Sequence, residues 1–115
     1  MIKYKNEMRT EERPNMRGGN GTVKITHALE QTEINGPMRL CATLTLEPGA
    51  SIGEHNHEKE DEIFYIVSGT AKINDNGTEK IVYAGDTIIT GNGDSHSIEN
   101  IGIDTLVVFA TIVTY

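Results

Sequence analysis

Three histidines and one glutamate are spaced so that the strands of a sheet could bring their side chains together. His55 and His57 are two residues apart, so on a β-strand both imidazoles point to the same side. After a polar stretch at 58–61, Glu62 opens an apolar segment and can return a carboxylate to the same point. His96 comes from much later in the chain, after two glycine-containing turns. Three imidazoles and one carboxylate form a mixed nitrogen and oxygen set suited to Mn, Fe, Ni, Cu or Zn.

The segments that must position these side chains are typical of short β-strands. Apolar and polar side chains alternate in some of them, and residues 63–67 are almost wholly apolar, which predicts a strand buried on both faces. The turn 75–78 predicts a hairpin because Asn and Gly tolerate positive φ. The expected strands are 22–30, 38–46, 63–67, 70–74, 79–82, 87–90 and 105–115. With 12 glycines and no helical pattern of useful length, the chain is expected to be an all-β barrel.

Composition and charge exclude several classes of partner. The net charge of −7 argues against nucleic acid and anionic membranes, which attract basic surfaces. No apolar run approaches the roughly 20 residues that span a bilayer. The single cysteine, Cys41, cannot form an intrachain disulfide, which fits a reducing compartment. Residues 1–7 lack the apolar core of a secretory signal, so the cytoplasm is the expected location.

The segments around the histidines resemble the two sequence motifs of the cupin superfamily. The first motif, a glycine, a His-x-His pair, a glutamate and a second glycine, corresponds to Gly49, His55, His57, Glu62 and Gly69. The second corresponds to Gly85, Gly93, His96 and Asn100, with Gly91 where the family has proline. The flanking strand pattern extends the resemblance over nearly the whole chain, and residues 15–21 look like the N-terminal arm of small bacterial single-domain cupins.

This resemblance implies a double-stranded β-helix, or jelly-roll barrel, that is usually dimeric and carries one metal in its mouth. The implied organisation is a polar, extended or irregular arm at 1–21 and a single barrel domain at 22–115. The implied cofactor is one divalent transition metal: Mn, Fe, Ni or Zn. Its implied ligands are His55, His57, Glu62 and His96.

A small, mostly apolar pocket beside the metal is expected to bind the substrate, with Phe64, Ile66 and Ile98 as candidate walls. Arg39 lies within an expected strand and either faces solvent or points into the barrel as an anion anchor. His27 is expected to be a core or interface histidine rather than a fifth ligand.

Two functional classes stay open at this point, because the complete ligand set disfavours a third, a structural or storage protein. One is a metal-dependent enzyme, a dioxygenase, isomerase or decarboxylase, acting on a small carboxylate or another oxygenated metabolite. The other is a non-catalytic ligand-binding or sensor cupin. Oxalate decarboxylases differ from this chain because they have two cupin domains, a lid glutamate and a substrate-binding arginine where Ile52 stands here. We therefore expect a homodimer that binds a small carboxylate, with catalysis left open.

Overall fold

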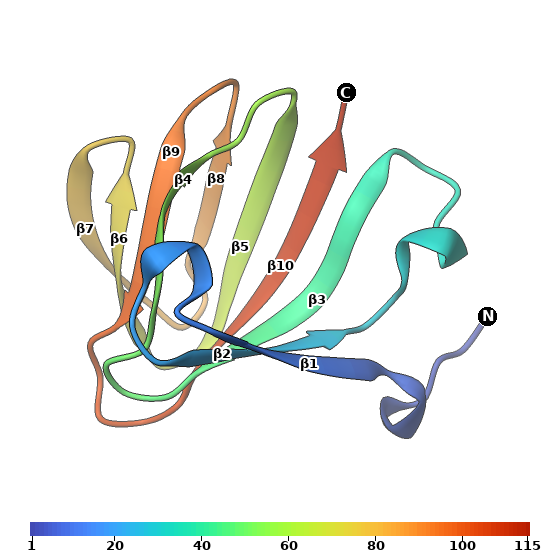
Figure 1. Cartoon of the computed structure of the whole chain (residues 1–115), viewed down its shortest axis with the longest axis horizontal. Coiled ribbons are helices and arrows are strands. Elements are labelled where there is room, and N and C mark those ends of the chain that lie inside the picture. Colours follow the sequence, from blue (N-terminus) through green and yellow to red (C-terminus); the bar gives the residue numbers. More distant parts are fainter.

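The computed structural model describes residues 1–115 and consists almost entirely of antiparallel strands (Figure 1). Three short 3₁₀ turns join them: η1 (Lys5–Glu7), η2 (Met16–Gly18) and η3 (Gln31–Glu33). The ten strands are β1 (Arg9–Pro14), β2 (Thr22–His27), β3 (Met38–Leu46), β4 (Ser51–Asn56), β5 (Glu60–Ser68), β6 (Thr70–Asp75), β7 (Thr78–Tyr83), β8 (Thr87–Gly91), β9 (Ser95–Asn100) and β10 (Leu106–Thr114). No helix in the chain has the length and apolar character needed to cross a membrane.

The strands form two sheets, which confirms the predicted all-β jelly-roll fold. The larger sheet has the order β1-β2-β3-β10-β5-β8, and the smaller has the order β4-β9-β6-β7. Every neighbouring pair in both sheets is antiparallel. Because β4 precedes β5 in the chain but lies in the other sheet, the short connection at 57–59 bridges the two sheets at one end of the sandwich. Residues on both sides of this connection can therefore meet between the sheets.

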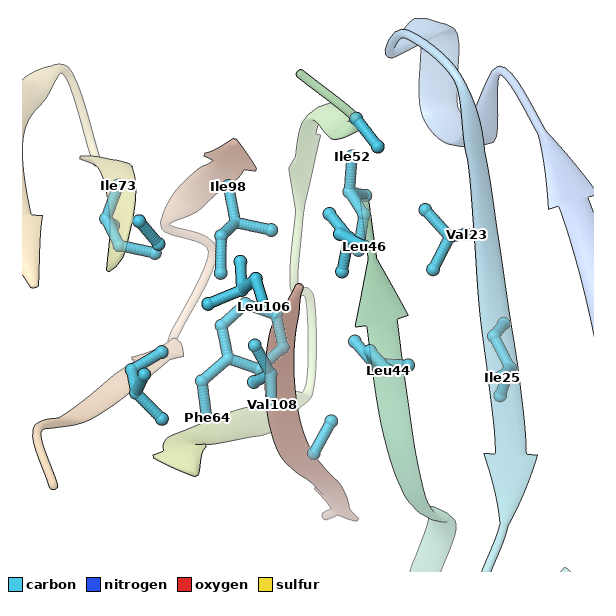
Figure 2. Close-up of a cluster of buried hydrophobic side chains, with 14 of the residues drawn as sticks. Val23, Ile25, Leu44, Leu46, Ile52, Phe64, Ile73, Ile98, Leu106 and Val108 are labelled. Carbon is cyan, nitrogen blue, oxygen red and sulfur yellow. The ribbon is translucent and has the colours of Figure 1, made fainter. Parts of the chain in front are cut away.

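The core lies between the sheets and follows the alternation of the strands. On β10, Leu106, Val108 and Ala110 are fully buried, while the residues between them face outward. Figure 2 shows side chains from both sheets converging, with the ring of Phe64 among them. Each large aliphatic side chain buried here contributes about 1.5–3 kcal/mol relative to exposure. The two sheets are thus held face to face by apolar packing, and the site is built at one end of that packing.

One strand differs from its prediction. Residues 63–67 lie within β5, but only Phe64 and Ile66 are buried. Tyr65 is 46% exposed and Val67 49% exposed on the outer face of the larger sheet. A wholly apolar run cannot distinguish a strand buried on both faces from one whose second face stays uncovered in the single chain.

The N-terminal arm contributes a strand to the larger sheet. Residues 9–14 pair with 22–27 as β1, and the segment 15–21 between them folds back towards β4 (Figure 1). Met16 from this segment packs against the hydrophobic core. The arm was expected to be extended or irregular, and the structure integrates it into the sheet and the core.

Candidate metal centre

The four predicted ligands come together at the end of the sandwich where the chain passes between the sheets. His55 on β4 is the direct register partner of His96 on β9 in the smaller sheet. His57 follows β4, and Glu62 lies near the start of β5 in the larger sheet. His57, Glu62 and His96 are buried, and His55 is partly buried. One ligand atom from each residue lies within 4.8 Å of the others, so the four side chains form a group able to hold a metal ion.

The separations of these atoms fit a single cation. Oε1 of Glu62 lies 3.0 Å from Nε2 of both His57 and His96, and 3.9 Å from Nε2 of His55. Nε2 of His96 lies 3.0 Å from Nε2 of His57 and 3.1 Å from that of His55. Two donors at right angles on bonds of about 2.1 Å would be about 3.0 Å apart. The donor set therefore suits a divalent transition metal in both chemistry and spacing.

The tautomers of two histidines are fixed by what their other ring nitrogen contacts. Nδ1 of His55 lies 2.7 Å from the carbonyl oxygen of Gly53, which can only accept a hydrogen bond. Nδ1 of His57 lies 2.8 Å from Oε1 of Glu60. Both rings therefore carry their proton on Nδ1 and direct the Nε2 lone pair into the cluster, as metal-binding histidines do.

Electrostatics keep the glutamate ionised inside the cluster. Burial alone would raise the pKa of Glu62, but the neighbouring imidazoles of His55, His57 and His96 hold it well below its usual range. The adjacent Glu62 carboxylate raises the pKa of His57 against the opposing effect of burial. Burial lowers the pKa of His96. An ionised carboxylate and a neutral His96 are the protonation states that a metal requires.

Phe64 holds the third imidazole in place. Its ring stacks on His96 with centroids 4.9 Å apart and planes at 14°. His96 Nδ1 is buried and has no hydrogen-bond partner, so the orientation of this ring rests on packing. Phe64, a candidate wall of the expected substrate pocket, also lines the cavity beside the ligands. Ile66 and Ile98, the other two candidate walls, lie in the hydrophobic core and do not line this cavity.

The cavity beside the ligands has a volume of about 150 Å³ and combines apolar walls with basic groups. Its apolar side chains come from both sheets and from the loop before β2. Its lining residues are Arg13, Met16, Arg17, Ile25, His27, Arg39, Leu40, Leu44, Ile52, His55, His57, Glu62, Phe64 and Ile112. Apart from the ligands, no lining residue carries a negative charge. Such a cavity suits a compact anion.

Arg39 faces this cavity because of an irregularity in the sheet. Ile112 on β10 pairs with Leu40 and the next residue pairs with Met38, so Arg39 is the extra, unpaired residue of a bulge. A bulge redirects side chains relative to the regular alternation of a strand. Counting alternate residues along the strand therefore could not predict where Arg39 points. Its guanidinium binds Glu60 through Nε at 2.6 Å and Nη2 at 2.8 Å. The charge of Arg39 is therefore already balanced by a carboxylate.

His27 also lines the cavity, at the end of β2. Its Nε2 lies 3.0 Å from Oε2 of Glu11 on β1, and its side chain is 12% exposed. It lies outside the group of metal-binding atoms.

Cys41 is half-buried, and burial raises the pKa of its thiol, which disfavours the reactive thiolate.

Sequence reasoning missed four residues that shape the site. Glu60 was part of a stretch expected to be a solvated loop, yet it links a ligand histidine to Arg39. Arg13, Met16 and Arg17 belong to the N-terminal arm and line the cavity. Their only sequence signal was the likeness of residues 15–21 to the arm of small cupins, which says nothing about where the arm packs.

Comparison with known proteins decides the family. Residues 42–113 match the family model described as the cupin domain. The chain belongs to the cupin family. It is also 42% identical to the oxalate-binding protein of Thermotoga maritima over 113 residues, which cover 98% of this chain and 93% of that protein.

Solved structures agree with this assignment. The cupin described here superposes on the crystal structure of a predicted oxalate decarboxylase from Thermotoga maritima with a TM-score of 0.95, 41% identity and complete coverage of both chains. A putative sugar phosphate isomerase from Acidithiobacillus ferrooxidans gives a TM-score of 0.77 at 19% identity, covering 99% of this cupin and 75% of that chain. The likeness to the putative isomerase shows that these two proteins share a fold.

Proposed function

We propose that this cupin binds one divalent transition metal, Mn, Fe, Ni or Zn, through His55, His57, Glu62 and His96 and uses it to hold a small carboxylate. The observation that carries the proposal is the convergence of these four donors beside a cavity lined by arginines and apolar side chains. A divalent cation with a single carboxylate ligand keeps net positive charge, because neutral imidazoles do not cancel it. At a few ångströms this charge outweighs the net −7 of the chain. The oxalate-binding relative supports a carboxylate as the ligand.

The residues around the cavity support binding more strongly than decarboxylation. When bound, the metal would supply a Lewis-acid centre or one that activates dioxygen. Decarboxylation also needs a proton donor at the substrate, and the only cavity-lining carboxyl group, Glu62, belongs to the ligand set. Apart from the ligand histidines, His27 is the one lining residue with an imidazole. If this cupin turns its ligand over, His27 is therefore the candidate acid or base.

Calorimetric titration of the metal-loaded protein tests the binding proposal. Oxalate, malonate, pyruvate and acetylacetone are titrated into wild-type protein and into His57→Ala, each with its metal content measured. We expect at least one carboxylate to bind wild-type protein with a Kd below 1 mM and to lose binding in the variant along with the metal. Absence of binding to metal-loaded wild-type protein, or equal binding by the variant, would refute the proposal.

We also propose that the functional unit is a homodimer formed through the outer face of the larger sheet. On β5, Tyr65 and Val67 are exposed there, and Ile89 on the edge strand β8 is 62% exposed. Tyr65 pairs with Phe109 of β10, so aromatic side chains lie side by side on this face. Apart from Asp61 near the start of β5, the outward residues of the three central strands are uncharged: Cys41, Thr43, Thr45, Ile63, Tyr65, Val67, Val107, Phe109, Thr111 and Val113. In a chain of charge −7, the middle of this face is a surface on which two copies can meet without burying charge.

A further inference from the structure

Three arginines line the cavity, and only one of them lacks a carboxylate partner. Arg39 is held by Glu60 through two hydrogen bonds. Arg13 donates from Nε to Oε1 of Glu11 at 2.6 Å. Arg17 forms no ion pair, and its guanidinium makes no hydrogen bond. The cavity therefore presents one uncompensated cation beside the metal-binding group.

The backbone at Arg17 is held in an unfavourable conformation. Its φ of 54° and ψ of 28° are left-handed, a conformation that is unfavourable for a residue with a side chain. Close packing on β4 maintains it, because a Cβ on Gly53 would lie 2.0 Å from the carbonyl oxygen of Arg17. Likewise, a Cβ on Gly19 would lie 2.2 Å from the carbonyl oxygen of Ser51. Strain that the surrounding packing maintains is a feature of functional sites.

Hydrogen bonds fix the rest of this loop. Asn20 and Ser51 exchange two of them: Ser51 N donates to Asn20 O at 2.9 Å, and Asn20 N donates to Ser51 Oγ at 2.8 Å. Asn15 closes the base of the loop, since its backbone N–H donates to Gly21 O at 2.8 Å and its side-chain amide to Gly19 O at 3.1 Å. The loop is thus a fixed support for the arginine rather than a free arm.

Gly53 contacts both the metal-binding group and the loop 15–21 that carries Arg17. Gly53 packs against the carbonyl of Arg17, and its own carbonyl accepts the hydrogen bond from Nδ1 of His55. One segment of β4 therefore places both the backbone of Arg17 and the ring of His55.

We propose that Arg17 determines specificity by binding the second carboxylate of a small dicarboxylate whose first carboxylate is held at the metal. The inference rests on the proposed function and adds the group that distinguishes two negative charges from one. A planar guanidinium binds a carboxylate through paired hydrogen bonds, which are among the stronger and more directional contacts in proteins. A cavity of about 150 Å³ is smaller than the pockets of drug-sized ligands, so it suits compact anions.

The test compares oxalate with pyruvate, which has one carboxylate, on manganese-loaded wild-type protein, Arg17→Gln and Arg17→Lys. Arg17→Gln should weaken oxalate binding at least tenfold and change pyruvate binding less than twofold. Arg17→Lys should retain part of the oxalate affinity, because it keeps the charge without the planar fork. Lys24→Gln, on an exposed position of β2, removes one positive charge elsewhere and should leave both affinities unchanged. Manganese affinity and the unfolding midpoint of each variant show whether the site and the fold are intact.

The outcomes separate this inference from the function on which it rests. If wild-type protein binds oxalate and Arg17→Gln binds it equally well, or loses oxalate and pyruvate binding to the same extent, the assignment of Arg17 is wrong and the binding function stands. If metal-loaded wild-type protein binds neither anion, both proposals are wrong. If Arg17→Gln fails to fold, Arg17→Lys decides: the loss of oxalate selectivity over pyruvate relative to wild type supports the assignment, and unchanged selectivity overturns it.

Discussion

Oε1 of Glu60 lies 2.8 Å from Nδ1 of His57, while the guanidinium of Arg39 binds the same carboxylate. The hydrogen bonds from Arg39, and then that from His57, lower the pKa of Glu60 to about 2 despite partial burial. Because the carboxylate is ionised at neutral pH, it can only accept from the imidazole. Glu60 therefore fixes the tautomer of His57 and orients its Nε2 towards the other ligands. Arg39 acts through Glu60, as a positioning residue for the metal site.

Replacing this carboxylate should weaken metal binding without removing a ligand. Glu60→Gln leaves Arg39 without its ion pair and lets the ring of His57 rotate or change tautomer. Losses of this kind typically cost tenfold to a hundredfold in metal affinity, and competition with a metal-binding dye measures it. Glu58→Gln is the matched control, because Glu58 is exposed and makes no hydrogen bond. Equal affinity in the Glu60 and Glu58 variants would show that His57 needs no such partner.

The close packing of Gly53 against Arg17 leads to a second prediction. Gly53→Ala places a methyl group where the carbonyl oxygen of Arg17 lies, so the loop must move. We expect an unfolding free energy lower by about 1–3 kcal/mol, as for other overpacked sites, together with weaker oxalate binding. Gly36→Ala is the control because no atom lies within 4 Å of the added methyl group. Urea unfolding and calorimetry measure the two effects, and a Gly53 variant as stable as the control would contradict the packing described here.

The sequence predicted the ligands more fully than their surroundings, for a physical reason. Side chains two apart on a strand share a face, so the pairing of His55 with His57 follows from spacing alone. The orientation of Arg39 depends on a bulge, which breaks that alternation. The position of Arg17 depends on glycine contacts between residues more than 30 apart in sequence, and no local pattern encodes these. The fold and the convergence of the four candidate donors were thus accessible from periodicity and motif, and the lining of the cavity was not.

The outer face of the central strands of the larger sheet leads to a third prediction, about assembly. Tyr65→Glu places a charge in the middle of this face, beside Phe109. If two copies meet here, burying the unpaired charge opposes association and the protein becomes monomeric. Light scattering should then give twice the chain mass of 12.6 kDa for wild-type protein and the single mass for the variant. Ile103→Glu is the control, because Ile103 is 93% exposed in the loop before β10 and should not affect the dimer. A monomeric wild-type protein at micromolar concentration would rule the dimer out.

The last prediction concerns pH and the strand contributed by the N-terminal arm. Glu11 on β1 accepts hydrogen bonds from Arg13, His27 and Arg9, which lower its pKa from about 4.5 to about 2. A carboxyl group whose pKa is depressed by folding stabilises the folded state above its unfolded pKa. This contribution is lost as the pH falls through the folded value.

Glu11→Gln should therefore lower the free energy of unfolding by about 1 kcal/mol at pH 7, a size typical of ion pairs open to solvent. The difference from wild type should shrink between pH 4.5 and pH 2, because protonation removes the charge that the variant already lacks. Urea unfolding at pH 7, 4 and 3 measures it, and comparing differences cancels the effects of other titrating groups that both proteins share. Glu12→Gln, at an exposed neighbouring position without an ion pair, is the control and should follow wild type at every pH. A Glu11 variant whose deficit stays constant down to pH 3 would mean that packing of the side chain, rather than its charge, attaches β1 to the sheet.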